Sequence, residues 1–388
     1  MSKATVHSRR TPRKATSLVY QPRRRQEWNG LSAQEILARH PPGKTPPLKV
    51  LELLIDLFNN QHTARYKEVS FKTRQERAQF LRRFFLDLKQ KAGFKTLPDP
   101  RNLGGRHVSA MVAVWQQRKL APPTLQTYLS FLRGLAQWVG KHGMIRQPQH
   151  YGLKPEEYER HAAAEYDKSW SAHGIDTAGL IARMCQFDRY VGAQVLLMRG
   201  LRLRKKEAIM CRPHQCIVPF EATGVPLHKK KADFYACIES GSKGGRERFV
   251  ALDTPEKLAA IEHAKSVVVT RDGHMGNPAH SLKQSMTRFD NVMKKFGVTK
   301  KKSGVTSHGL WHEGLIDDYE KLTGEAPPVR GGAPLPREID RPARQEVAEV
   351  AGHSRTRAAS AYLGQSGVMR SKVARRPPSA GFYDPDST

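Results

Sequence analysis

The sequence predicts a mainly α-helical fold with a small antiparallel β-sheet or hairpin, an α+β class, organised as more than one domain. Apolar residues recur at helical spacing in both halves of the chain, and one pair of strand-like segments flanks a glycine-rich turn. The length of 388 residues fits two to three domains, and 38% apolar residues are enough for packed cores.

The net charge predicts a polyanionic partner. The chain has 66 Lys and Arg residues against 36 Asp and Glu residues, a formal charge of +30. A surplus of this size attracts nucleic acid, because neutralising phosphates releases counterions. Residues 1 to about 28 carry basic residues and no acidic residue before Glu27, which fits a basic arm on DNA or a solvated tail.

Other function classes are disfavoured by what the sequence lacks. It has no apolar run long enough to span a bilayer and no signal-peptide core, so we expect no membrane partner. Its four cysteines form no CxxC pair and have no zinc-site spacing. We therefore expect a cytoplasmic protein with no metal and no cofactor.

Four helices are expected between residues 46 and 142. Leu51, Leu54 and Phe58 mark the first, and Thr73 with Glu76 reads as a capping box that opens the second. Apolar residues at helical spacing from 108 to 115 mark the third helix, and a Pro-Pro pair at 122–123 begins the fourth. This segment is expected to be a DNA-binding domain or, alternatively, any basic four-helix domain. The basic residues that we expect on its outward faces are Arg77, Arg82, Arg83 and Lys89.

The second half combines helices with the hairpin. Residues 143–175 lack apolar periodicity and are expected to be a linker, and helical spacing returns at about 177. The hairpin strands are 233–238 and 246–252, around a turn at 241–245. Helices are expected over 255–268, 281–296 and about 344–363, with a long loop over 324–344. The expected divisions are a flexible arm (1–45), a helical domain (46–142), the linker, a second domain (176–365) and a flexible tail (366–388).

Four short segments of the second half hold residues suited to phosphodiester chemistry without a metal. Arginine and histidine donors stabilise the charge that gathers on a phosphate under attack. A lysine at a hairpin tip can protonate a leaving oxygen, and a tyrosine can be a covalent nucleophile. No carboxylate cluster that would hold two magnesium ions is visible. The residues concerned are Arg204 with Glu207, then Lys243, then His308, Trp311 and His312, and finally His353 and Tyr362.

In order and spacing, these segments resemble the catalytic boxes of tyrosine recombinases of the phage-integrase family. The first arginine of the family lies three residues before a glutamate, which selects Arg204 over the alternative Arg202. Tyr362 follows His353 by nine residues, the family's usual gap to its nucleophile. The resemblance covers about 177–365, and residues 46–142 resemble the family's core-binding domain only in general character.

The resemblance implies a C-shaped clamp on double-stranded DNA and a covalent 3′-phosphotyrosyl intermediate. Tyr362 would be the nucleophile and Lys243 the general acid, while Arg204, His308 and His353 would hold the phosphate, with Glu207 and His312 in support. Arg246 and Arg355 join the expected DNA-binding residues. The expected assembly is a homo-tetramer on synapsed DNA that integrates or excises a mobile element at the nucleoid of a prokaryote, with an accessory DNA-bending or directionality factor as a further candidate partner.

Trp311 departs from the family pattern, which has arginine three residues after the first histidine of this box. Three explanations stand: the site is degenerate, another arginine enters it, or the tryptophan is an inactivating change. The alternative functions are a non-catalytic DNA-binding protein and a type IB-like topoisomerase. The candidate substitutes are Arg330, Arg337, Arg355 and Arg357.

Overall fold

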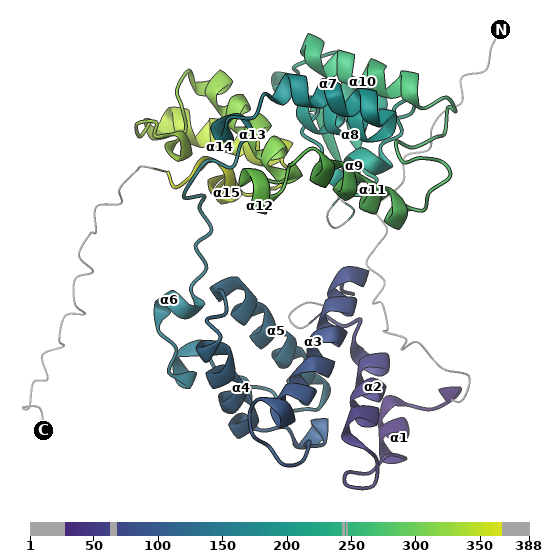
Figure 1. Cartoon of the computed structure of the whole chain (residues 1–388), viewed down its shortest axis with the longest axis vertical. Helices are drawn as coiled ribbons and strands as arrows, with labels where there is room; N and C mark the ends of the chain where they lie inside the picture. Colours follow the sequence, from purple (N-terminus) through teal and green to yellow (C-terminus); the bar gives the residue numbers. More distant parts are fainter. Residues whose placement is uncertain (1–27, 63–67, 243–244, 246, 367–388) are drawn as a thin grey trace, which may run out of the picture. The chain divides into compact units, whose positions relative to one another are not determined.

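The computed structural model of the protein describes residues 28–62, 68–242, 245 and 247–366. The chain divides into two compact units between Arg160 and His161 (Figure 1). Helices predominate, and the described strands form one small antiparallel sheet, as the sequence predicts. None of the described helices is long and apolar enough to cross a membrane.

The first unit is helical around one apolar core. Leu54, Leu81, Phe84, Val112 and Leu129 are fully or almost fully buried there, which confirms the expected inner faces. Each helix therefore contributes one apolar stripe to a shared interior. The helices are α1 (Ala33–Ala38), α2 (Pro47–Phe58), α3 (Phe71–Gln90), α4 (Gly105–Gln117), α5 (Pro122–Trp138) and α6 (Pro155–Tyr158).

Two local features of this unit differ from expectation. The second predicted helix, α3, begins at Phe71 and not at Thr73, because the Ser70 side chain accepts a hydrogen bond from the Thr73 backbone N–H at 3.2 Å. Part of the expected flexible arm is also folded: Ser32 caps α1, and Ile36 packs with Trp28 and two leucines of α2. Residues 1–27 of that arm lie outside the described range.

The expected linker also contributes to both cores. Ile145 and Leu153 are buried in the core of the first unit, whereas Trp170 is completely buried in the second. The unit boundary between Arg160 and His161 therefore lies well inside 143–175, and the ends of this range are structural. Sparse apolar residues without helical spacing can still anchor a segment when each fills a site in a core.

The larger core of the second unit is covered by helices and a three-stranded sheet. The order of the strands is β1-β2-β3, with Tyr235 opposite Ala251 and Ile238 opposite Arg248. The predicted hairpin corresponds to β2 and β3, whereas β1 was not predicted. The elements are α7 (Thr177–Phe187), α8 (Arg189–Gly200), α9 (Lys205–Met210), β1 (Ile217–Pro219), β2 (Phe234–Ile238), β3 (Arg248–Ala251), α10 (Pro255–Val267), α11 (Leu282–Lys295) and α12 (Lys300–Ser303).

A smaller core joins the last three helices, α13 (Ser307–Thr323), α14 (Arg337–Val350) and α15 (Ser360–Leu363). Trp311, Leu315, Val347 and Tyr362 are buried in it. The expected loop over 324–344 is shorter, because α14 already begins at Arg337. The expected helix over 344–363 is instead divided: α14 ends at Val350, and Gly352 adopts a positive φ of 77° before α15 begins.

Candidate active site

The structure joins seven of the predicted site residues through an unbroken series of contacts. Four parts of the second unit supply them: the start of α9, helix α13, the turn after α14, and α15. We call this set the Arg204 cluster. Its members are Arg204, Glu207, His308, Trp311, His312, His353 and Tyr362.

Arg204 is held at the N-terminus of α9. Its backbone N–H donates to Glu207 Oε2 at 2.8 Å, and its Nη1 donates to Glu207 Oε1 at 2.9 Å. Its Nη2 donates to the carbonyl oxygen of Ala351 at 2.5 Å, which connects α9 to the end of α14. The arginine side chain remains 20% exposed, so its guanidinium can still reach an added ligand.

Glu207 is completely buried between two arginines. Arg248 of β3 donates from Nη2 to Glu207 Oε2 at 2.9 Å and from Nε to the carbonyl oxygen of Val350 at 2.9 Å. Burial raises the pKa of Glu207, but the charges and hydrogen bonds of Arg248 and Arg204 outweigh it, so this pKa is lowered and the carboxylate stays charged. Arg248 was not predicted; the available signal was its position two residues before Val250, on the same inward face of β3.

Arg202, the alternative to Arg204, is engaged elsewhere. It has a positive φ of 55°, is 5% exposed, and pairs with Asp318 through Nε and Nη2 at 3.0 and 2.8 Å. Its guanidinium is therefore committed to a structural ion pair. This geometry favours Arg204 as the arginine that faces the cluster.

Trp311 is an interior residue with 1% exposure. Its Nε1 donates to the carbonyl oxygen of Arg202 at 2.7 Å, so its single N–H is already used. Its ring lies 4.9 Å from the Arg204 guanidinium carbon and 4.9 Å from the Tyr362 ring centroid. The indole thus packs against both the arginine and the tyrosine, and it offers a cation–π contact rather than a donor to a phosphate.

His308 and His312 lie one turn apart on α13. The His308 ring stacks on Trp311 at 4.8 Å, and the His312 ring meets the Tyr362 ring edge-on at 5.0 Å. Although part of His308 is exposed, loss of solvent lowers its pKa to about 4, helped by Arg204 and Lys168. Burial, His308 and Lys168 lower the pKa of His312 to about 3. Both rings are neutral at pH 7.

Replacing His312 with glutamine should flatten the dependence of stability on pH. The folded pKa of His312 lies below the ordinary value of 6.5, so the unfolded chain takes up a proton first as the pH falls. Stability is therefore unaffected above about pH 6.5 and falls below it, by about 1 kcal/mol between pH 7.5 and 5.5. Urea unfolding of both proteins at the two pH values measures this, and an equal loss in both would contradict it.

A hydrogen bond joins His353, in the turn after α14, to Tyr362 on α15. His353 Nε2 lies 2.9 Å from the Tyr362 hydroxyl oxygen. Tyr362 is 7% exposed, and burial raises its pKa while Arg204 partly opposes the rise. A phenol with a raised pKa needs a base to attack, and a histidine at this distance can accept its proton in the suitable tautomer.

Two protein-family models match parts of the sequence. One, described as integrase, matches residues 173–313, and the other, described as phage integrase N-terminal, matches residues 58–145. The chain belongs to the phage-integrase family of tyrosine recombinases. This confirms the resemblance inferred from the four segments. The first match includes His308, Trp311 and His312 but ends before His353 and Tyr362.

Solved recombinase structures are similar to this chain. A lambda integrase tetramer bound to a Holliday junction is 12% identical with a TM-score of 0.50, and the match covers 87% of this chain and 83% of that one. XerH recombinase bound to its difH substrate is 13% identical, with a TM-score of 0.46 and coverage of 82% and 81%. No curated protein matches the sequence. At these identities the likeness concerns the fold alone.

Of the arginines considered as substitutes for the missing one, Arg330 is committed elsewhere in this recombinase. Its Nε pairs with Asp167 at 2.9 Å and its Nη1 with Glu320 at 2.9 Å. Arg337 and Arg357 line a separate pocket, and Arg355 is exposed. Within the described residues, none of these four arginines forms a hydrogen bond or an ion pair with a member of the Arg204 cluster. Lys243 and Arg246 lie outside that range.

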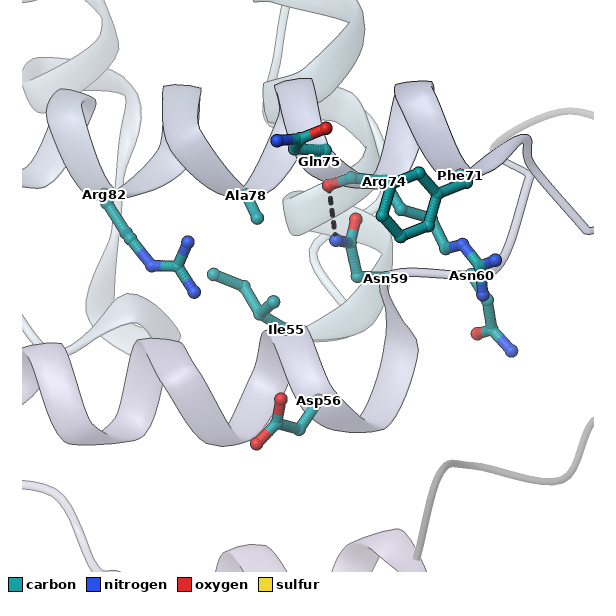
Figure 2. A pocket seen from close by; sticks show the side chains of 9 residues that line it. All are labelled: Ile55, Asp56, Asn59, Asn60, Phe71, Arg74, Gln75, Ala78 and Arg82. Atoms are coloured by element: carbon teal, nitrogen blue, oxygen red, sulfur yellow. Dashed lines mark hydrogen bonds between the residues drawn. The ribbon is translucent and has the colours of Figure 1, made fainter. Parts of the chain in front are cut away.

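The predicted DNA-binding residues of the first unit fall into two groups. Arg77 was placed on an outward face, but it is 2% exposed and donates from Nε to Asn59 Oδ1 at 2.6 Å, so it is structural. Arg82 is exposed and pairs with Glu52 through two bonds of 2.6 Å. Figure 2 shows Arg82 beside Ile55 at a pocket of about 370 Å³ between α2 and α3. Arg83, paired with Asp87, and Lys89 are also exposed.

Proposed function

We propose that this chain is a site-specific DNA recombinase that cuts and rejoins DNA through a covalent 3′-phosphotyrosyl intermediate. The observation that carries the proposal is the 2.9 Å hydrogen bond between Tyr362 and His353. It places a buried phenol beside a base and near Arg204, whose charge already acts on the Tyr362 hydroxyl. A nucleophile, a base and a phosphate-binding cation thus occur together.

The cleavage step follows from these groups. The Tyr362 oxygen attacks the scissile phosphorus as His353 accepts the phenol proton, and the bond from phosphorus to the 5′ oxygen breaks. Lys243, which lies between β2 and β3 in the sequence, is assigned from the sequence alone as the donor of a proton to that leaving oxygen. Arg204 and His308 stabilise the charge on the non-bridging oxygens. Rejoining is the same step in reverse, with the 5′ hydroxyl as nucleophile.

Trp311 would act in this reaction by supporting Arg204. Its N–H is bound to Arg202, but its ring lies against the Arg204 guanidinium. It can therefore keep that guanidinium oriented without contacting the phosphate itself.

Replacing Trp311 with phenylalanine should therefore preserve DNA cleavage while lowering stability. The ring contact with Arg204 is retained, whereas the hydrogen bond to the Arg202 carbonyl is lost, which costs about 1–2 kcal/mol. Adduct yield on DNA and the urea midpoint report the two effects separately. A loss of cleavage in the phenylalanine variant, with its fold intact, would show that the indole N–H takes part in the reaction.

A second candidate function is favoured by the same residue. Because the Trp311 N–H is taken and no arginine stands at this position, the site has one guanidinium fewer than the family pattern. Losing such a donor typically lowers the rate by about 10²–10³-fold. The chain would then be a DNA-binding protein that kept the recombinase fold and lost cleavage.

Double-stranded DNA is the proposed partner, on the basis of the +30 charge and of family membership. The lambda integrase with the same fold was solved as a tetramer on a Holliday junction, which supports the proposal of a tetramer on synapsed DNA. The proposed task is integration or excision of a mobile element in a prokaryote, with the protein at the nucleoid.

A plasmid that carries two copies of the element's own end sequence tests this function. Recombinant circles from the native chain would support a site-specific recombinase. Relaxation of any plasmid, without dependence on the end sequence, would indicate a topoisomerase instead. Binding with no strand cleavage would support the second candidate.

A further inference from the structure

A basic pocket of about 400 Å³ lies beside the segment that carries Tyr362, outside the Arg204 cluster. Helix α14 supplies Arg337, Arg341 and Arg344 to its lining. The residues just before Tyr362 supply Arg357 and Ser360. The pocket is therefore lined by four arginine side chains, three from α14 and one from the segment before Tyr362.

The positive charge of this pocket is only partly compensated. Asp340 is its one lining acid, and that carboxylate already accepts hydrogen bonds from Arg344, from the Tyr319 hydroxyl at 2.7 Å and from the Ser366 hydroxyl at 2.8 Å. Among the residues that the structure describes, Arg337, Arg341 and Arg357 form no ion pair, and all three are exposed. Three uncompensated arginines at one pocket attract an anion.

Arg344 gives the second, independent indication of a ligand. It is 3% exposed; its Nε binds Asp340 at 2.7 Å, and its Nη1 donates to the carbonyl oxygen of Gly364 at 3.0 Å. Its Nη2 is buried and has no hydrogen-bond partner among the described residues. A buried charged donor without an acceptor is unfavourable, so an oxyanion in the pocket that the Arg344 side chain also lines would stabilise this nitrogen once a small shift of the side chain brought the two into contact.

We propose that this pocket binds a phosphate-class oxyanion. Arg344 Nη2 would donate to it from the buried side, and Arg341 and Arg357 would clamp it from the exposed side with their planar forks. The anion could be a backbone phosphate of DNA or a free phosphate compound, since both present the same oxygens.

An anion bound in the pocket would also order the short segment around Tyr362, the proposed nucleophile. Ser360 lines the pocket two residues before Tyr362, and Arg344 holds Gly364 two residues after it. An anion bound between them would fix both sides of Tyr362. This last step rests on the proposed function, whereas anion binding does not.

The test uses the full chain, inorganic pyrophosphate and thermal unfolding at constant ionic strength set with chloride. Pyrophosphate should raise the melting temperature of the native chain, and Arg341→Gln with Arg357→Gln should weaken its apparent affinity by about tenfold or more. Arg183→Gln with Arg271→Gln removes the same charge from exposed sites of the same unit and should respond like the native chain. Arg341→Lys with Arg357→Lys keeps the charge but loses the forks, and it should also weaken binding.

An equal response of all four proteins, or no response of the native chain, would overturn the proposal. Duplex DNA then separates the two sources of phosphate. If the pocket takes a DNA phosphate, the pocket variant should lower the slope of log affinity against log salt more than the control variant does. If the slopes fall equally, the ligand is a free phosphate compound. A native chain that binds pyrophosphate but never forms a DNA adduct would leave the pocket intact and refute the cleavage function.

Discussion

Replacing Tyr362 with phenylalanine should abolish the covalent protein–DNA adduct while leaving DNA binding unchanged. The variant loses the hydroxyl that would bond to phosphorus, and removal of a covalent nucleophile typically lowers the rate by roughly 10⁴-fold or more. The phenyl ring keeps its edge-on contact with Trp311, and only the hydrogen bond to His353 is lost, which costs about 1 kcal/mol.

The matched control is Tyr190→Phe. Tyr190 lies on α8 of the same unit, and its hydroxyl oxygen accepts a hydrogen bond from Arg189, away from the cluster. Adduct yield after denaturation in detergent, with DNA affinity measured in parallel, should separate the two variants. If the Tyr362→Phe protein still gave an adduct, another residue would be the nucleophile.

Replacing Glu207 with glutamine should destabilise the second unit strongly and impair cleavage. Glu207 is completely buried and compensates both Arg204 and Arg248, so its loss leaves two guanidinium charges unpaired. Breaking a buried pair on one side costs about 3–5 kcal/mol. The amide keeps only one acceptor oxygen, so it cannot accept all the hydrogen bonds that Arg204 and Arg248 donate to the carboxylate, and the Arg204 guanidinium would be held less firmly.

Urea unfolding measures this effect, with Glu262→Gln as control. Glu262 is an exposed partner of Lys265 on α10, and the loss of such a pair changes stability by no more than about 1 kcal/mol. A Glu207→Gln midpoint equal to that of the control would contradict the buried ion-pair account. Cleavage by any folded fraction then shows whether Arg204 remains in place.

The sequence predicted those helices whose ends are marked by a nearby proline, glycine or capping residue. Pro122 begins α5 as expected. Thr254 caps α10 and Gly297 follows α11, and both helices begin and end within one residue of the expected ranges. The hairpin was also predicted, because its glycine-rich turn separates two short apolar strands. These signals depend only on neighbouring residues, so the sequence shows them directly.

The elements that were missed depend on contacts between distant segments. Strand β1 is only three residues long and exists through its pairing with β2. Arg77 was predicted outside because charged residues normally are, yet Asn59 supplies it with buried partners.

The cluster was predicted as a set of residue types, but not as a network. Order and spacing selected Arg204, His308, His353 and Tyr362, and the structure brings these four together. Neither the pairing of Arg248 with Glu207 nor the hydrogen bond from the Trp311 N–H to Arg202 could be predicted, because both join segments more than 40 positions apart. From the sequence alone, Trp311 is a position that lacks a phosphate donor. The same contacts show that its ring also packs against Arg204 and can support that side chain.

The most direct test of the cleavage proposal is covalent trapping on a nicked duplex that carries the element's own end sequence. The native chain and Trp311→Arg are incubated with it in parallel, and any adduct stable in denaturant is mapped to a residue. We expect an adduct from the native chain, with the DNA attached to Tyr362. An adduct from Trp311→Arg alone would contradict the account and identify the native protein as a DNA-binding recombinase fold without cleavage.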